Sequence, residues 1–350
     1  LSVHLGWGYN NVRAAYDEVS EKIQSEVYEN AKAFAKENKY RYDCGGYIYV
    51  GEGQDLGQFW AKLAVGDGKI QKSSSNTAIT KSNDCYSLSG ATYGVYSDKG
   101  CTKSVAILTT NANGNTDTVE LRAATYYVKE TKAPKGFQLD KNVYTMTVKV
   151  NETTTLKVSD KPKVTDTLVE LFKIDMEISK ATPQGNASLE GAEFVWKYYD
   201  GYYTKDNLPS EPTRTWTTKT TTEKDSNNEV HYITRLADSY KVLGDSFYTQ
   251  NGTICLPLGT ITVKEKTAPN GYLLEGAYMQ AAGSSEQIKG VYVAQITEDG
   301  ELAALSGSNQ YSVLDKVIRG GVKIQKRDLE TKDTKAQGGA TLKDTAFEII

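Results

Sequence analysis

The chain has 350 residues, of which 39% are hydrophobic and 24% are charged, and its formal net charge is −3. Because it has neither a basic surplus nor an apolar run of transmembrane length, we expect no nucleic-acid partner and no membrane insertion. The 24 tyrosines and only 7 prolines favour antiparallel β-structure, and the length is enough for two or three domains.

The first long element that the sequence predicts is an amphipathic helix over residues 10–39. Its apolar side chains recur at steps of three and four, the spacing of one helix face. They are Val12, Tyr16, Val19, Ile23, Val27, Ala31 and Phe34. Short runs typical of strands follow at YRYDC, GYIYV and LGQFW. Residues 1–66 are therefore predicted to form a small α+β segment.

Beyond this segment the helical periodicity disappears, and short alternating runs are separated by clusters of Asn, Gly, Asp and Ser. This rhythm predicts a mainly β fold of tandem Ig-like β-sandwiches. We place the first sandwich at residues 67–165 and the second at 166–319, with a long insertion near 198–256. Residues 320–350 are expected to be the truncated start of a third.

Several phrases occur twice in the chain. VKETKAPKGF at 128–137 returns as VKEKTAPNGY at 263–272, and KIQK stands at 69–72 and again at 323–326. Such repetition indicates copies of one domain in series. It argues against a single-site enzyme, and the sequence has no nucleophile elbow, phosphate loop or Cys/His cluster. We therefore expect no turnover enzyme, no cofactor and no metal site.

The four cysteines are too few for a disulfide framework. Cys85 and Cys101 flank a predicted strand and turn, so they either pair in an oxidising compartment or are two separate small apolar residues. For Cys44 and Cys255 the sequence suggests no disulfide pairing. His231, like the other histidine, stands alone in the sequence, which predicts no zinc site.

Four features together resemble the Cna B-type, or SpaA-type, domains of Gram-positive surface adhesins and pilins. They are the lysine-bearing KIQK strand, the LxGAxF phrase, the ETxAPxGY phrase with its glutamate, and a last strand that ends in Asp-Lys. The resemblance covers residues 67–350 and implies small prealbumin-like β-sandwiches. It also implies an extracellular, cell-wall-attached protein. Sortase and the cell wall would be partners of the full-length protein, beside a host surface ligand that the sequence does not define.

Many members of that family form a spontaneous amide bond between a first-strand lysine and a last-strand Asp or Asn, assisted by the glutamate. Burial disfavours both charges, so it lowers the pKa of an amine and raises that of a carboxyl until the neutral groups face each other. A buried glutamate then moves the protons, while folding holds the pair at reacting distance. Carried onto the first copy, the resemblance implies Lys69 as nucleophile, Glu130 as proton shuttle and Asp160 as acceptor. Strand alternation alone argues against Lys69 as the buried nucleophile, because Ile70 should point inward and Lys69 toward solvent.

The second copy departs from this pattern in its first strand. Alignment of VELFKID with VKIQKRD places Glu170 where Lys323 stands, and Glu265 and Asp315 hold the other two positions. Lys173 is expected on the opposite strand face from Glu170, so we expect three acids, no amine and no amide bond. Three arrangements fit these three acids. Two of the carboxyls could share a proton, a cation could lie between them, or Glu170 could simply point to water. Lys323 of the third copy is expected to be an unreacted amine.

Residues 1–66 resemble the end of the thioester domains that lie at the tips of such adhesins. GQDLGQFW at 53–60 is similar to the glutamine-bearing strand of that family, which makes Gln54 the candidate thioester glutamine and Gln58 the second choice. The family's cysteine lies far upstream of this strand, and Cys44 matches it poorly. The alternative is a small α+β domain with a surface glutamine.

The sequence therefore predicts a structural role. The chain would be a stalk segment of a cell-wall-anchored surface adhesin or pilin-like protein, stiffened by an autocatalytic Lys–Asp amide in the first repeat. The alternative is a host-ligand binding module for carbohydrate or protein, because exposed aromatic side chains suit such contacts. Its candidate surface is the aromatic insertion of the second repeat: Trp196, Tyr198, Tyr199, Tyr202, Tyr203 and Trp216.

Overall fold

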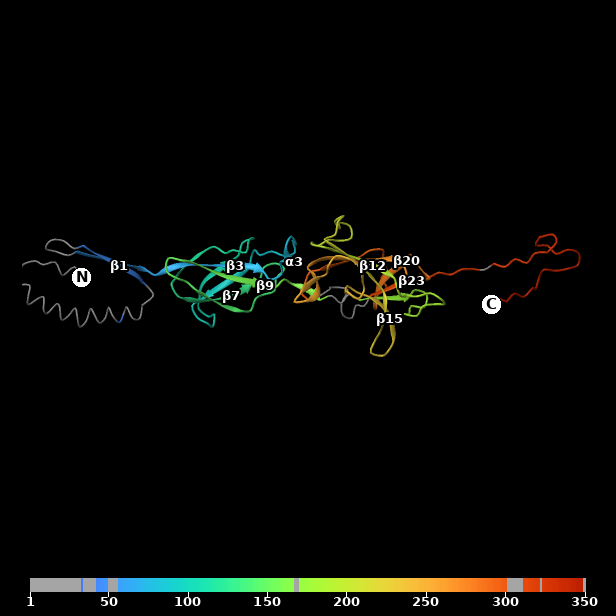
Figure 1. The fold of residues 1–350 in the computed structure, drawn as a ribbon, viewed down its shortest axis with the longest axis horizontal. Coiled ribbons are helices and arrows are strands. Elements are labelled where there is room, and N and C mark those ends of the chain that lie inside the picture. The colour runs from blue at the N-terminus through green and yellow to red at the C-terminus, as the bar shows by residue number, and fades with distance from the viewer. Residues whose placement is uncertain are drawn as a thin grey trace, which may run out of the picture.

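The structure of the chain is a computed structural model. It describes residues 33, 42–49, 56–166, 170–300, 311–321 and 323–348. These residues form a β-hairpin and two β-sandwiches that follow one another along the long axis of the molecule (Figure 1). The helix predicted over residues 10–39 lies outside the described ranges except at Ala33, which is helical. Within the described ranges, no helix is long and apolar enough to cross a membrane.

The hairpin consists of β1 (Tyr42–Tyr49) and β2 (Leu56–Leu63), which are antiparallel. Its register places Gln58 opposite Tyr47. The connection between the strands contains Gln54 and lies outside the described residues. The thioester role considered for Gln54 therefore stays a prediction.

The first sandwich packs a three-stranded sheet in the order β6-β3-β9 against a four-stranded sheet in the order β5-β4-β7-β8. Burial alternates along β3, as expected for a strand with one face in a core. The apolar core takes side chains from both sheets, among them Ile70, Tyr93 and Val128. The strands are β3 (Val65–Ser74), β4 (Thr92–Tyr96), β5 (Ser104–Thr109), β6 (Val119–Arg122), β7 (Thr125–Lys132), β8 (Val143–Thr147) and β9 (Thr153–Asp160), and one helical turn, α3 (Thr77–Thr80), follows β3.

The second sandwich is larger, with a six-stranded sheet, β14-β15-β11-β23-β20-β21, facing a five-stranded sheet, β16-β13-β12-β19-β22. The first of these sheets contains β11 (Leu171–Asp175), β14 (Thr221–Lys224), β15 (Val230–Thr234), β20 (Tyr272–Ala281), β21 (Ile288–Lys289) and β23 (Tyr311–Val317). The second contains β12 (Glu193–Tyr199), β13 (Arg214–Lys219), β16 (Lys241–Gly244), β19 (Gly259–Thr267) and β22 (Tyr292–Ile296). The chain is thus mainly β, as predicted.

Most of the aromatic side chains considered as a binding surface are buried in the second sandwich. Trp196 and Tyr198 on β12, and Trp216 on β13, are 0% exposed, and Tyr199 is 4% exposed. Tyr202 is 39% exposed. These strands pair with each other in the middle of the five-stranded sheet, so their inward side chains form the core. The expectation of an exposed aromatic face is wrong for the buried members of this set.

The junction between the two sandwiches is a continuous, hydrogen-bonded contact. Asn83 Nδ2 of the first sandwich donates to Tyr198 Oη at 2.9 Å and to the Leu258 carbonyl at 3.2 Å. The Leu258 N–H in turn donates to the Tyr86 hydroxyl at 2.9 Å. Tyr86 and Phe137 of the first sandwich belong to the same apolar cluster as the core of the second. The two sandwiches therefore share buried apolar surface.

Part of the connection between the sandwiches is a strand. Its residues form β10 (Val164–Asp166), which pairs with β18 (Thr253–Pro257) of the second-repeat insertion, and β17 (Tyr248–Gln250) completes the small sheet. Asp299 reinforces this region, because its two carboxylate oxygens accept hydrogen bonds from the Val164 N–H and from Gln138 Nε2, both at 2.9 Å. The insertion thus packs on the junction.

The C-terminal stretch after β23 contains no strand within its described residues, up to 348. The first strand of a third sandwich was expected here. A single strand has no partner for its backbone N–H and C=O groups, and none of the described residues pairs with this stretch. Lys323 and Lys326 are both exposed.

The junction contact should contribute to the stability of the second sandwich. We expect Asn83→Ala to cost about 1–3 kcal/mol, because it removes three buried hydrogen bonds, to Tyr198, Leu258 and Cys85, and leaves these partners less well satisfied. The matched control, Asn113→Ala, changes an exposed asparagine and should stay within about 0.5 kcal/mol of the unsubstituted chain. Denaturant unfolding followed by tryptophan fluorescence measures both. Equal unfolding midpoints would contradict a stabilising junction.

Candidate functional site

A lysine and two carboxylic acids meet inside the first sandwich. The Lys72 amine lies 2.8 Å from Glu130 Oε1 and contacts Asp160 Oδ2. The three side chains are almost completely buried, with residue exposures of 1% for Lys72 and 2% for each acid. The rings of Tyr93 and Phe137 lie beside the amine, with centroids 5.5 and 6.0 Å from Nζ.

The strand register explains why these residues meet. In the parallel pair β3–β9, Lys72 stands opposite Val158 and Asp160 follows two residues later on the same face. Glu130 comes from β7 in the facing sheet, where alternate residues from Tyr126 onward are buried. The cluster therefore bridges both sheets of the sandwich.

The lysine in this cluster is Lys72, so the assignment of Lys69 was wrong. Ile70 and Lys72 are buried at 0% and 1% exposure, whereas Lys69 is partly exposed. Side chains two apart on a strand share a face, so the second lysine of KIQK points inward with Ile70. The alternation in the sequence carried this signal. Glu130 and Asp160, by contrast, lie at the cluster.

The second sandwich contains the same arrangement. The Lys173 amine lies 2.7 Å from both Glu265 oxygens and 2.5 Å from Asp315 Oδ1. Lys173 and Asp315 are 0% exposed and Glu265 is 7% exposed. In the parallel pair β11–β23, Lys173 stands opposite Val313 and Asp315 follows two residues later. This register repeats that of Lys72 and Asp160.

The expectation of three acids and no amine in the second sandwich was therefore wrong. It arose because Glu170 was aligned with the first lysine of KIQK, whereas the inward position is the second. Glu170 is partly exposed and forms an ion pair with Arg235 at 2.5 Å. The same shift makes Lys326, rather than Lys323, the equivalent lysine of the third copy.

Burial changes the acidity of both clusters. It raises the pKa of Asp160 to about 6, although the hydrogen bond and charge of Lys72 oppose the rise. Burial also raises the pKa of Glu265 to about 8, where Lys173 opposes the rise and Asp315 adds to it. A carboxyl with a raised pKa keeps its proton to higher pH. The raised pKa thus falls on the aspartate in the first cluster and on the glutamate in the second.

The acceptor carboxyls are poorly satisfied as hydrogen-bond acceptors. Asp160 Oδ1 has no hydrogen-bond partner among the described residues, and neither oxygen of Asp315 accepts a well-directed hydrogen bond. A buried ionised carboxylate normally requires such partners. An amine touching an under-satisfied carboxyl, with a second carboxyl to move protons, is the arrangement that amide formation requires.

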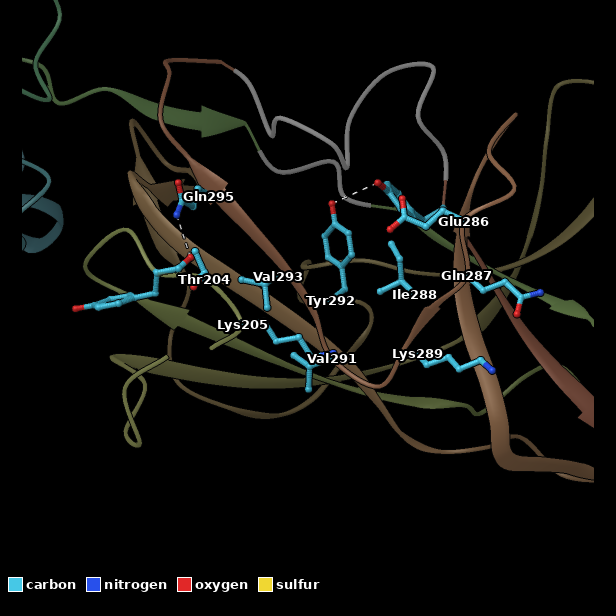
Figure 2. Close-up of a pocket in the computed structure, with 12 residues that line it drawn as sticks. Thr204, Lys205, Glu286, Gln287, Ile288, Lys289, Val291, Tyr292, Val293 and Gln295 are labelled. Atoms are coloured by element: carbon cyan, nitrogen blue, oxygen red, sulfur yellow. Dashed lines mark hydrogen bonds between the residues drawn. The ribbon is translucent and has the colours of Figure 1, made fainter. Parts of the chain in front are cut away.

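Cavities of different size lie on the second sandwich, and two of them bear on the site. The larger, a groove of about 650 Å³, is shown in Figure 2. Its lining includes Lys205, Lys289 and Tyr292, and Gln295 Nε2 donates to the Tyr203 carbonyl at its wall. The lining residues of this groove do not include either lysine–acid cluster. The smaller cavity, of about 240 Å³, opens onto Glu265.

A possible metal-binding group lies at the β14–β15 hairpin, where the side chains of Asp225, Glu229 and His231 approach one another within 4.8 Å. His231 is thus not isolated in space, unlike in the sequence. The Asp225 carboxylate also accepts backbone N–H bonds from Asn227 and Glu229, which is the usual role of Asp in a turn. These backbone hydrogen bonds of the β14–β15 turn account for the position of the Asp225 carboxylate without a metal ion.

The two cysteines considered as a pair are not bonded to each other. Cys85 is buried at the junction and Cys101 is partly exposed in the turn after β4, and both are free thiols. Burial raises the pKa of the Cys85 thiol. The disulfide alternative is therefore wrong, and the reading as separate residues applies.

Residues 75–162 match the SpaA family, which is described as a prealbumin-like fold domain. The matched segment contains Glu130 and Asp160 and begins three residues after Lys72. The trypsin-resistant surface T6 protein of Streptococcus pyogenes serotype M6 (strain ATCC BAA-946 / MGAS10394) is 40% identical over 88 residues. This match covers 23% of the present chain and 16% of that protein, so the chain spans only a small part of its relative.

Solved structures to which the chain is similar include the Bacillus anthracis TIE protein, at 22% identity and a TM-score of 0.42, with 79% of this chain and 41% of that chain covered. The C-terminal fragment of the pilus adhesin SpaC from Lactobacillus rhamnosus GG has 16% identity and a TM-score of 0.36, with 73% and 99% covered.

The buried lysine of the first sandwich should be far more important for stability than its neighbour in KIQK. Lys72→Ala leaves two buried acids without their cation, so we expect a loss of about 3–5 kcal/mol or more. Lys69→Ala removes a partly exposed side chain and should cost less than about 0.5 kcal/mol. Denaturant unfolding of the two variants measures the difference. A larger loss for Lys69→Ala would contradict the placement of Lys72.

Proposed function

We propose that this chain, whose first sandwich is a SpaA-type prealbumin-like domain, is a stalk segment of a bacterial surface protein of the adhesin or pilin kind. Two self-formed amide bonds, Lys72–Asp160 and Lys173–Asp315, stiffen it. The observation that carries the proposal is the twice-repeated contact of a buried lysine amine with an aspartic acid beside a glutamic acid. The name of the T6 relative, a surface protein, supports the surface location. Sortase-mediated attachment to the cell wall belongs to the same proposal.

The reaction in each site is a condensation within the folded chain. The neutral lysine nitrogen attacks the aspartic acid carbonyl carbon, a C–N bond forms, and the acid hydroxyl leaves as water. The glutamate carboxyl relays a proton from the attacking nitrogen to the leaving hydroxyl. Folding already holds the reacting atoms in contact, so the reaction step loses little further entropy in bringing them together. Each site reacts once and is its own substrate.

The positions of the proposed bonds determine how the chain carries tension. Each joins the first strand of a sandwich to its last, parallel strand. Force that enters through β3 passes through the Lys72–Asp160 bond and leaves near β10, so the intervening residues carry no load. The second bond does the same from β11 to β23. Between the two bonds, the load path runs through the short connection between the sandwiches, which neither proposed bond spans.

The junction supports this role in the part of the load path that lies between the two proposed bonds. The connection is held as β10 against β18 and by the Asp299 hydrogen bonds. Buried contacts across the junction, including those of Asn83 and Tyr86, resist bending between the sandwiches. Two covalently closed domains joined in this way form a stiff rod.

Glu130→Gln tests the proposed chemistry in the first site. Glutamine keeps the size of the side chain but does not shuttle protons, so the Lys72–Asp160 bond should form about 100- to 10,000-fold more slowly. Tryptic mapping detects the branched peptide that joins the two strands. The Lys173–Asp315 peptide in the same molecule is the internal control and should be unaffected. Equal yields of the first branched peptide with and without the substitution would rule out the shuttle role.

Single-molecule stretching tests the stalk role. In the unsubstituted chain, the 88-residue span between Lys72 and Asp160 should not extend. Lys72→Met retains a long side chain but has no amine, so unfolding of the first sandwich should release about 300 Å of chain at roughly 3.5 Å per residue. Release of that length by the unsubstituted protein would contradict the proposal.

A further inference from the structure

The two lysine–acid clusters differ in one aromatic residue. In the first, the Lys72 amine also donates to the Tyr93 hydroxyl at 3.0 Å. Phe194 holds the equivalent place in the second, with its ring centroid 5.9 Å from Lys173 Nζ. The equivalence follows from register, because Tyr93 pairs with Glu130 across β4–β7 as Phe194 pairs with Glu265 across β12–β19. The first site therefore has a hydroxyl that the second lacks.

The glutamates of the two sites are held differently. Glu130 uses Oε1 for the Lys72 amine, while its Oε2 accepts the backbone N–H of Asp140 at 2.8 Å. Glu265 instead offers both oxygens to Lys173, each at 2.7 Å. In the first site, Glu130 thus accepts only one N–H of the amine. The amine needs another acceptor for its second N–H.

Tyr93 supplies that acceptor. Its side chain is buried, at 1% exposure, and its hydroxyl lies near the carboxyl groups of Glu130 and Asp160. Burial and the neighbouring carboxylates raise the pKa of Tyr93, so the hydroxyl keeps its proton. It can therefore donate to Glu130 and accept from Lys72 at the same time. The Tyr93 oxygen thus gives the Lys72 amine a second hydrogen-bond acceptor beside Glu130.

A neutral amine has two N–H bonds and one lone pair. When Glu130 and Tyr93 accept the two N–H bonds, the remaining direction, that of the lone pair, faces the third neighbour, Asp160. In the second site, the two oxygens of Glu265 accept both N–H bonds of the Lys173 amine, so no hydroxyl is required. The hydroxyl compensates for the Glu130 oxygen that is occupied by the Asp140 backbone.

We infer that Tyr93 is a positioning residue of the first amide-forming site, where its hydroxyl orients the Lys72 amine toward Asp160. The inference rests on the proposed amide formation. Tyr93 is not consumed: the Nζ–Cγ bond forms, the Asp160 hydroxyl leaves as water, and Glu130 moves the proton between them. The second site needs no tyrosine because Glu265 binds both N–H groups.

Tyr93→Phe gives the first site the aromatic residue of the second but leaves Glu130 tied to Asp140. The protein is recovered in unfolded form, before either bond has formed, and is refolded by dilution. Samples are quenched at successive times, and tryptic mapping measures how much of each bond has formed. We expect the Lys72–Asp160 bond to form about 3- to 10-fold more slowly, the equivalent of one hydrogen bond. The Lys173–Asp315 bond in the same molecules should form at its usual rate. The variant should fold, since Phe194 occupies this place in the second sandwich.

Tyr126→Phe is the matched control. It removes another tyrosine hydroxyl from the first sandwich, one that donates to the Arg122 carbonyl at 2.9 Å and does not contact Lys72. A merely structural effect would slow the first bond equally in both variants, and this result would overturn the inference. An unchanged first-bond rate in Tyr93→Phe would also overturn it, while leaving the proposed function intact. Absence of both bonds in the unsubstituted protein would overturn the proposed function and the inference with it.

Discussion

The constraint on which the structure depends is the burial of a lysine amine between two carboxylic acids in each sandwich. A buried charge is tolerated only when it is paired, so Lys72 and Lys173 each require both acids in place. Lysine and aspartate lie on neighbouring parallel strands, and the glutamate lies on the facing sheet. The cluster therefore connects the first strand, the last strand and the opposite sheet of each domain. A covalent bond at this position makes that connection permanent.

The two domains satisfy this constraint by the same register and by different local chemistry. Lysine stands opposite a valine, and the aspartate follows two residues later in both sandwiches. The glutamates differ because the Asp140 backbone occupies one oxygen of Glu130, whereas Glu265 gives both oxygens to its lysine. The raised pKa also falls on different acids: Asp160 in the first site and Glu265 in the second. The repeated register is thus compatible with more than one way of holding the reacting groups.

Much of this architecture follows from the sequence because it depends on local pattern and repetition. The mainly β class was predicted from short alternating runs, and the positions of Glu130, Asp160, Glu265 and Asp315 came from repeated phrases. The lysine was misplaced because KIQK contains two candidates, and the first was chosen against the alternation that marks Ile70 as inward. Because the first lysine of KIQK was used for the alignment, Glu170 was placed at the lysine position of the second repeat and Lys173 was not recognised. The junction was not predictable, since Asn83 and Leu258 meet only after both sandwiches have folded. Nor does composition reveal that Trp196 and Trp216 belong to the core rather than to a binding face.

The central claim is that both clusters have reacted in the folded protein. The most direct test is the intact mass of the full chain, measured after denaturation under reducing conditions, where only covalent bonds within the chain alter the value. Two amide bonds predict a mass lower than that of the sequence by two molecules of water. A mass equal to that of the sequence would contradict the account and leave both sandwiches as ordinary, non-covalently stabilised domains.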